Sequence, residues 1–360
     1  MRPACRIVFV SLLLLGLTWL PPASADCDPV RLAAFDVGSG TTRMRVVELW
    51  PCDQGRWVTV LAEEANIAFA ADLLETGNGS FSPALRESAT ERVSGLVDVA
   101  RTQGAVVLTG VATQAFRRAT NAADLVADWR VRFGLDIDII SQQAEGRLAY
   151  QLIEARRADR ADRANLVVWD IGGGSQQLVW RDPRDASLHH FNSTLASVSF
   201  RRLAMTHLGR PYAATSPNPI SPAEAEALLL LAGDLVAGEI PQTLRLRIAE
   251  GAQVVGVGGV HGASLTRQAG IQAGQSLSRP LLEQTLSEQL GKDDQAIGGA
   301  YADTDVTNLI LVLGLMREYG IDAYEATRHD LTEALLLDWS LRRHESERLE
   351  AALDTLAGQH

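Results

Sequence analysis

One motif occurs twice in this chain and constrains the fold more than any other feature. An apolar strand ends in an aspartate and a glycine-rich turn, and a second strand-like segment follows. The first copy runs through Asp36-Val37-Gly38-Ser39-Gly40-Thr41-Thr42, and the second through Asp170-Ile171-Gly172-Gly173-Gly174-Ser175-Gln176. The wide separation of the copies indicates a duplicated domain rather than a short-period repeat. We expect two hairpin loops that hold one phosphate chain from opposite sides.

The segments between and after the two motifs alternate between strand and helix patterns. In the first half, strands at 57–63, 105–108 and 135–140 alternate with helices at 83–101, 121–133 and 142–156. The second half repeats this plan, with strands predicted at 166–171, 177–180, 188–192, 253–257 and 323–326 and helices at 222–237 and 331–343. Such alternation predicts an α/β fold with mixed sheets.

The first 25 residues have the organisation of a secretory signal peptide. Arg2 and Arg6 precede an apolar stretch at 7–20, and Ala23-Ser24-Ala25 provides small residues for cleavage. We therefore expect an exported protein, periplasmic or secreted, that starts near Asp26 and has no membrane association after cleavage. An uncleaved membrane anchor is the alternative.

Two cysteines, Cys27 and Cys52, remain after signal removal and lie symmetrically about the first glycine turn. An antiparallel hairpin brings both to its open end, and export favours their oxidation. We predict a disulfide that closes a loop of about 25 residues and contributes roughly 3 kcal/mol. Two free thiols are the alternative.

The formal net charge of −11 and the single lysine, Lys292, limit the possible ligands. An acidic surface repels a nucleic-acid backbone, so no nucleic-acid partner is expected. Phosphate recognition must then depend on arginine, backbone amides and a metal ion, because the lysine-dependent P-loop motif is absent from the sequence.

Glycine-rich turns expose consecutive N–H groups that bind phosphate without side-chain interference. Hydroxyl groups in both turns add donors, although glycine after a strand often only makes a hairpin. Asp36 and Asp170 would face each other across a cleft, and paired carboxylates beside phosphate indicate Mg²⁺ or another divalent cation. Hydrogen bonding to the amides of their own turns is the alternative.

Three further segments contain candidate residues. Arg117, in the segment 113–121, is a candidate phosphate ligand, and Glu145, at the start of a helix, is a candidate general base. A third glycine turn, at 255–262, is expected to begin a helix and to offer free amides to an anion. His261 in that turn is expected to be a structural or surface residue.

The order of these motifs resembles that of the exopolyphosphatase and guanosine pentaphosphate phosphohydrolase (Ppx/GppA) family of the actin-like superfamily. The resemblance implies a short form with two actin-like (ribonuclease H-like) domains and a cleft between them. It implies Mg²⁺ dependence, with Asp36 and Asp170 as metal ligands, and Glu145 as the base that activates water. The phosphate-chain ligands it implies are Asp36, Gly38, Ser39, Gly40, Thr41, Arg43, Arg117, Asp170, Gly172, Gly173, Gly174, Ser175, Gly258 and Gly259.

The expected domains are 1–25 as signal peptide, 26–155 as domain I completed by a C-terminal helix at 335–360, and 156–334 as domain II. The chain departs from the family pattern at Gln177, Val260 and Thr332, where an acid, a hydroxyl and an arginine are usual. We predict an exported hydrolase that releases terminal phosphate from inorganic polyphosphate or a related compound, with a homodimer as its candidate assembly. A polyphosphate- or nucleotide-binding protein with weakened catalysis and an exported nucleoside triphosphatase are the alternatives.

Overall fold

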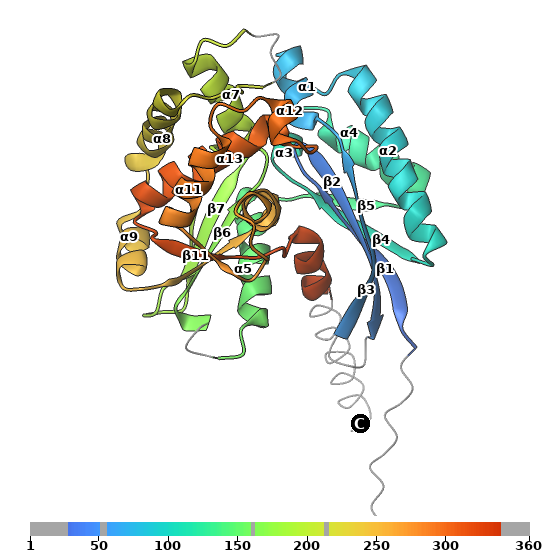
Figure 1. The fold of residues 1–360 in the computed structure, drawn as a ribbon. Helices are drawn as coiled ribbons and strands as arrows, with labels where there is room; N and C mark the ends of the chain where they lie inside the picture. The colour runs from blue at the N-terminus through green and yellow to red at the C-terminus, as the bar shows by residue number, and fades with distance from the viewer. Residues whose placement is uncertain (1–27, 51–55, 160–162, 212–215, 340–360) are drawn as a thin grey trace, which may run out of the picture.

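The computed structural model describes residues 28–50, 56–159, 163–211 and 216–339. These residues form two α/β halves, each built on its own sheet and covered by helices (Figure 1). Cys27, Cys52 and the predicted signal peptide lie outside the described residues, so the disulfide remains a prediction.

The first half has a five-stranded mixed sheet in the order β3-β2-β1-β4-β5. The first three strands form the antiparallel meander, while β4 pairs with β1 and β5 with β4 in parallel. The elements are β1 (Val30–Val37), β2 (Thr41–Trp50), β3 (Arg56–Asn66), α1 (Phe69–Thr76), α2 (Pro83–Thr102), β4 (Val107–Ala112), α3 (Gln114–Arg118), α4 (Ala122–Phe133), β5 (Asp136–Ile139) and α5 (Gln142–Arg156).

Local chemistry explains several of these boundaries. The Ser82 hydroxyl accepts a hydrogen bond from the Leu85 N–H and Pro83 occupies the first turn, so α2 begins there. Gly134 ends α4 in the left-handed conformation. Asn121, which precedes α4, uses its side chain to bind both backbone polar groups of Phe81 and so joins α4 to the start of α2.

The second half has a six-stranded sheet in the order β10-β11-β9-β6-β7-β8. Its strands are β6 (Leu166–Ile171), β7 (Gln176–Arg181), β8 (Leu188–Ser193), β9 (Gln253–Val257), β10 (Ser276–Ser278) and β11 (Ala323–Ala326). Its helices are α7 (Ser197–His207), α8 (Pro222–Ala237), α9 (Gln242–Ala249), η1 (Val260–Leu265), α10 (Thr266–Gln268), α11 (Arg279–Gln289), α12 (Asp294–Ile297) and α13 (Ala302–Tyr319).

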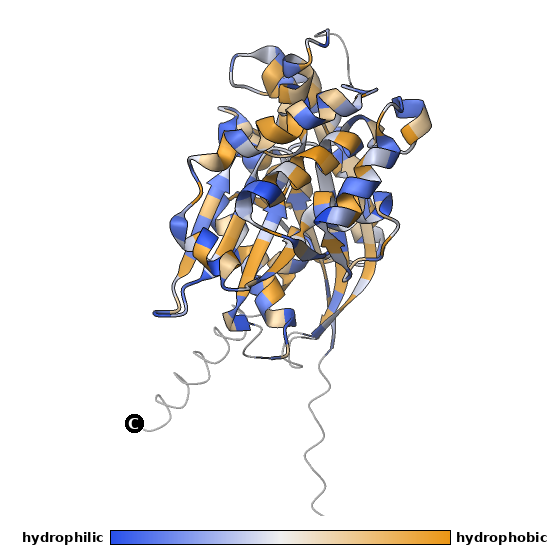
Figure 2. Cartoon of the chain, turned by 60° about the vertical axis from the view of Figure 1, so that its left-hand side comes forward, coloured by the Kyte–Doolittle hydropathy of each residue, from blue (hydrophilic) through white to orange (hydrophobic). Residues whose placement is uncertain are grey.

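Each half has its own apolar core, and the apolar residues of the strands and helices face inward between layers (Figure 2). In the first core, Phe69, Phe81 and Phe116 pack with ring centroids about 5 Å apart. In the second core, α13 is almost wholly buried against α7, α8 and α11. No single helix within the described ranges is long and apolar enough to span a membrane; only the bent pair α8 and α9 passes that test jointly.

Helix α5 lies between the two halves. One of its faces, with Ala149, Tyr150 and Ile153, packs on β6, β7 and β9 of the second sheet. Another face, with Leu148 and Leu152, contacts Val111 of β4 and the helical residues 331–339. These last residues also cover the first sheet, since Leu336 packs against Leu32, Ala34, Val47 and Leu49. Both sheets are therefore joined through one shared layer of helices.

The two halves repeat one structural unit in detail. In the first hairpin, the carbonyls of Ser39 and Gly40 accept hydrogen bonds from the amides of Ala70 and Ile67, at the start of α1. In the second hairpin, the carbonyls of Gly172 and Gly173 accept from Ser197 and Val198, at the start of α7. Each glycine loop is thus fixed to the helix that follows its own meander, which supports the duplication inferred from sequence.

The predicted strand at 105–108 was misplaced, because β4 runs from Val107 to Ala112. Glycine at position 110 interrupts the sequence pattern of a strand, yet it is required inside the sheet. A Cβ at this position would lie 2.5 Å from the Phe35 carbonyl oxygen, so only glycine allows β1 and β4 to approach this closely.

An ion cluster connects β2 to the C-terminal segment. The Arg45 guanidinium binds the Thr332 hydroxyl at 2.9 Å and lies 3.1 Å from a carboxylate oxygen of Asp330 and 3.3 Å from one of Glu333. The side chains of these three charged residues are largely buried. Arg45 therefore compensates two carboxylates that have little contact with water.

Replacing Arg45 with methionine should lower the free energy of unfolding by about 3 kcal/mol, because the Asp330 carboxylate loses its arginine partner and Glu333 keeps only Arg156 and His329. Chemical denaturation measures this loss. The matched control is Arg130→Met, which removes an exposed ion pair to Asp136 and should change stability by less than about 1 kcal/mol. Equal effects in the two variants would contradict a stabilising role for the cluster.

Candidate functional site

The two glycine loops meet at the interface of the two halves. A Cβ added to Gly173 would lie 3.5 Å from the Ser39 Cβ and 3.8 Å from the Gly40 nitrogen, so the loops are in contact. Gln114, at the start of α3, packs against Gly174 and accepts a hydrogen bond from the Ser39 hydroxyl at 3.2 Å. The fold therefore brings together two segments that are far apart in the sequence.

The predicted pair Asp36 and Asp170 lies beneath these loops, together with the third glycine turn. Both carboxyl groups are buried, and the Arg43 guanidinium lies 3.8 Å from Asp36. Gly258 has a φ of +84°, and a Cβ there would lie 2.7 Å from Oδ1 of Asp170. A Cβ on Gly259 would lie 2.9 Å from Arg43 Nη2. Glycine is needed at 258, where φ is positive, whereas a side chain at 259 would displace the end of Arg43.

Burial and mutual repulsion destabilise the charged forms of both aspartates. Burial, opposed by Arg43, raises the pKa of Asp36 to about 7, with further contributions from Asp330 and Glu145. Burial also raises the pKa of Asp170 well above its usual range, and the charges of Glu145 and Asp36 raise it further. Within the described ranges, hydrogen bonds from backbone amides make no contribution to the pKa shift of either carboxylate. A bound cation would therefore stabilise the charged forms of both carboxyl groups.

This donor set suits Mg²⁺, which binds proteins through one or two carboxylates and takes its other ligands from water and phosphate oxygens. No group of three or more histidine, cysteine, aspartate or glutamate side chains that could hold a metal ion is found in the part of the chain that the structure describes. Asp36 and Asp170, with their raised pKa values, are the candidate ligands for such an ion.

Glu145 lies in the first turn of α5, which begins at Ser141, whose hydroxyl accepts from the Ala144 N–H. Its side chain is buried, and its carboxylate accepts a hydrogen bond of 2.8 Å from Arg117 Nη1. Arg117 also donates to the Ile140 carbonyl oxygen and to the Ser175 hydroxyl of the second loop. The predicted base and the predicted phosphate-binding arginine therefore lie together beside a glycine loop.

Burial raises the pKa of Glu145, while the charge and hydrogen bond of Arg117 and a hydrogen bond from Gln177 lower it. The Gln177 amide also donates to the Ser175 hydroxyl at 3.2 Å. A neutral amide in place of an acid thus acts as a donor to the Glu145 carboxylate. The sequence departure at Gln177 avoids a second like charge beside this base.

The hydroxyl of Thr41 approaches Asn66 rather than the aspartates, and Tyr301 lies close by. The Tyr301 hydroxyl, from the second half, bonds to Glu64 and Asn66 at 3.0 Å each, and Glu64 lies 3.5 Å from Arg43. No sequence motif marked Gln114, Gln177 or Tyr301 as a binding or catalytic residue. Gln114 and Gln177 border motifs that the sequence did reveal, whereas Tyr301 has no local signal.

His261 follows the third glycine turn in η1 and is fully buried rather than exposed. Its Nδ1 hydrogen-bonds the Tyr324 hydroxyl at 2.8 Å, and its ring packs on Trp169. Burial lowers the pKa of His261 to about 3. This histidine is a neutral structural residue that supports the turn.

His261 should make the fold sensitive to acid. Because its folded-state pKa is about 3 and its unfolded value near 6.5, the unfolded chain binds an extra proton between these limits. This proton reduces stability by about 1.4 kcal/mol per pH unit as the pH falls through that window. His261→Asn should therefore flatten the pH dependence of the unfolding free energy between pH 6.5 and 4.5. Parallel profiles would contradict this origin.

The fold and the paired hairpin loops define an actin-like α/β protein. A solved Ppx/GppA family member from Aquifex aeolicus superposes with a TM-score of 0.66 at 16% identity, covering 87% of this chain and 98% of the other. A solved exopolyphosphatase from Cytophaga hutchinsonii gives a TM-score of 0.68 at 15% identity, covering 86% and 97%. At these identities the likeness concerns the fold.

Residues 53–192 match the model of the Ppx/GppA phosphatase family. Exopolyphosphatase 1 of Mycobacterium leprae is 24% identical over 149 residues, which cover 41% of this chain and 42% of that relative. The match thus spans about two fifths of the curated relative's length. The chain is thus similar to the Ppx/GppA phosphatase family, in sequence over residues 53–192 and in fold over most of its length.

Proposed function

We propose that the protein is an exported phosphohydrolase that releases terminal phosphate from inorganic polyphosphate or a related compound by metal-assisted attack of water. The observation that carries this proposal is the buried Glu145, held by Arg117 beside the second glycine loop. The match of residues 53–192 to the Ppx/GppA family model and the similarity to an exopolyphosphatase support the reaction class. The N-terminal sequence pattern supports export.

The two glycine loops and the two arginines bind the substrate in this proposal. The Gly38–Gly40 and Gly172–Gly174 segments offer backbone N–H groups to phosphoryl oxygens. Arg43 and Arg117, each now paired with a carboxylate, add charge-assisted hydrogen bonds that orient the terminal phosphate. Bound Mg²⁺, held by Asp36 and Asp170, supplies neutralisation of the charge on the phosphate oxygens.

Glu145 accepts a proton from the attacking water as the oxygen–phosphorus bond forms and the bridging bond to the rest of the chain breaks. A base whose pKa is raised by burial is well matched to this task near neutral pH. Arg117 and Gln177 keep the carboxylate ionised and fix its direction. The residues around Glu145 therefore orient the water as well as the phosphate.

The test is a substrate panel on the protein without residues 1–25: long-chain polyphosphate, tripolyphosphate, ATP and guanosine pentaphosphate, with and without Mg²⁺. Phosphate release from the condensed phosphates, abolished by a chelator, is the expected result. A preference for ATP would identify a nucleoside triphosphatase instead. Tight binding of polyphosphate without turnover in several divalent cations would identify a binding protein.

A further inference from the structure

A pocket of about 580 Å³ opens beside the second glycine loop and is not used by the proposed chemistry. We call it the side pocket. Its walls come from both halves of the molecule: α1 and α3 from the first, and α7, α8 and the segment 192–195 from the second. Gly173 and Gly174 form part of its lining, so it is continuous with a loop that is proposed to bind phosphate.

Two consecutive arginines on α3 have side chains in different regions, one in the buried site and one in the side pocket. Arg117 turns toward Glu145 and Ser175, whereas Arg118 lines the side pocket. Arg118 is exposed and has no hydrogen bond or ion pair among the residues that the structure describes. Neighbouring positions on one short helix therefore present one guanidinium to each region.

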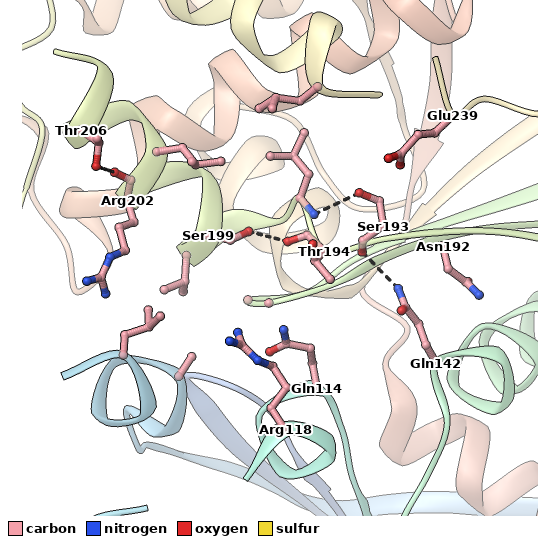
Figure 3. A pocket seen from close by; sticks show the side chains of 18 residues that line it. Gln114, Arg118, Gln142, Asn192, Ser193, Thr194, Ser199, Arg202, Thr206 and Glu239 are labelled. Atoms are coloured by element: carbon pink, nitrogen blue, oxygen red, sulfur yellow. Dashed lines mark hydrogen bonds between the residues drawn. The ribbon is translucent and has the colours of Figure 1, made fainter. Parts of the chain in front are cut away.

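A second arginine, Arg202 of α7, lines the same pocket from the other half of the molecule. In Figure 3, Arg118 extends from α3 and Arg202 from α7, on opposite walls of the pocket. Glu239 is the one acidic residue of the lining. Two guanidinium groups line one pocket in a chain whose net charge is −11, which indicates an anionic ligand.

Neutral donors complete the lining. The Gln142 amide donates to the carbonyls of Gln176 and Ser193 at 3.0 and 3.1 Å, and so holds the segment between β8 and α7 beside the loop. The Asn192 side chain, labelled in Figure 3, makes no hydrogen bond within the described ranges. Arginine forks with neutral amides match the oxygens of phosphoryl groups.

We propose that the side pocket binds the phosphoryl groups of a condensed phosphate chain that lie beyond the cleaved end. This inference rests on the proposed function and deepens it: Arg118 and Arg202 become the residues that determine preference for chain length. A substrate long enough to fill the pocket gains two arginine contacts that a short one lacks. The apolar part of the lining, including Leu203 and Leu235, would suit an organic group instead, and the test separates these ligands.

The variants are Arg118→Gln and Arg202→Gln, with Arg118→Lys to restore charge. Arg92→Gln, on the exposed face of α2, is the matched control for loss of one positive charge. We expect each glutamine variant to raise KM for long-chain polyphosphate about tenfold, the usual effect of losing a charge-assisted hydrogen bond. Values of kcat and the KM for tripolyphosphate should change less than about twofold. Arg118→Lys should recover part of the affinity.

Three outcomes would overturn the proposal: equal loss on long and short chains, equal loss in the control, or a loss confined to guanosine pentaphosphate or ATP. The last would show that the pocket binds an organic group. Titration calorimetry of long-chain polyphosphate, with melting curves to verify folding, tests the pocket without turnover. If the wild-type protein hydrolyses nothing, the proposed function fails, while a tenfold loss of binding in Arg118→Gln and Arg202→Gln would still support the pocket.

Discussion

Glu145→Gln is expected to lower kcat for polyphosphate hydrolysis about a thousandfold while KM changes less than about threefold. General-base catalysis contributes about 10² to 10⁴ in rate, and the buried carboxylate has no neighbouring acid on α5 to replace it. The amide keeps the size of the side chain and a carbonyl oxygen for Arg117. The loss should therefore fall on the chemical step rather than on binding.

The matched control is Glu154→Gln on the same helix. Glu154 also pairs with an arginine, Arg181, at 3.0 Å, but it lies toward the far end of α5. Phosphate release by Glu154→Gln should stay within about twofold of the wild type. Equal activity of Glu145→Gln and the wild type would remove Glu145 from the mechanism.

Asp170→Asn is expected to abolish phosphate release and to stabilise the protein without added metal. Asp170 is buried, and the charges of Glu145 and Asp36 repel its carboxylate. Asparagine keeps the shape and removes the charge. The free energy of unfolding at neutral pH should rise by about 1 kcal/mol or more, because the uncompensated carboxylate is gone.

Thermal melting in the presence of a chelator measures this gain. Asp182→Asn provides the opposite case, because the hydrogen bonds from Arg184 hold the pKa of Asp182 below its usual range. That variant should melt lower than the wild type. A lower melting temperature for Asp170→Asn, or retained activity, would contradict the role proposed for Asp170.

Local sequence signals predicted the elements of this fold but not all of their contacts. The two Asp-Gly turns depend on residues close in sequence, and both hairpins are present. Gly110 interrupts the strand pattern in the sequence. It is required because a Cβ there would clash with Phe35 on the neighbouring strand. Sequence periodicity cannot register such a requirement.

In the candidate site, too, the sequence predicted individual residues but not the contacts between distant segments. Glu145 and Arg117 were identified separately, and their 2.8 Å contact arises because α3 and α5 follow the neighbouring parallel strands β4 and β5. The contribution of Gln177 to Glu145, and the arginine pair of the side pocket, depend on how two halves meet. No pattern along a single chain segment contains that information.

The attachment of each glycine loop to its own helix has a consequence for motion. Because the amides of Ala70 and Ile67 hold one loop, and those of Ser197 and Val198 the other, each loop moves with its half as a rigid body. Opening the site then requires the halves to separate, without local melting of either loop. Hydrogen exchange should find these four amides slow to exchange, and product release should follow the rate of that separation.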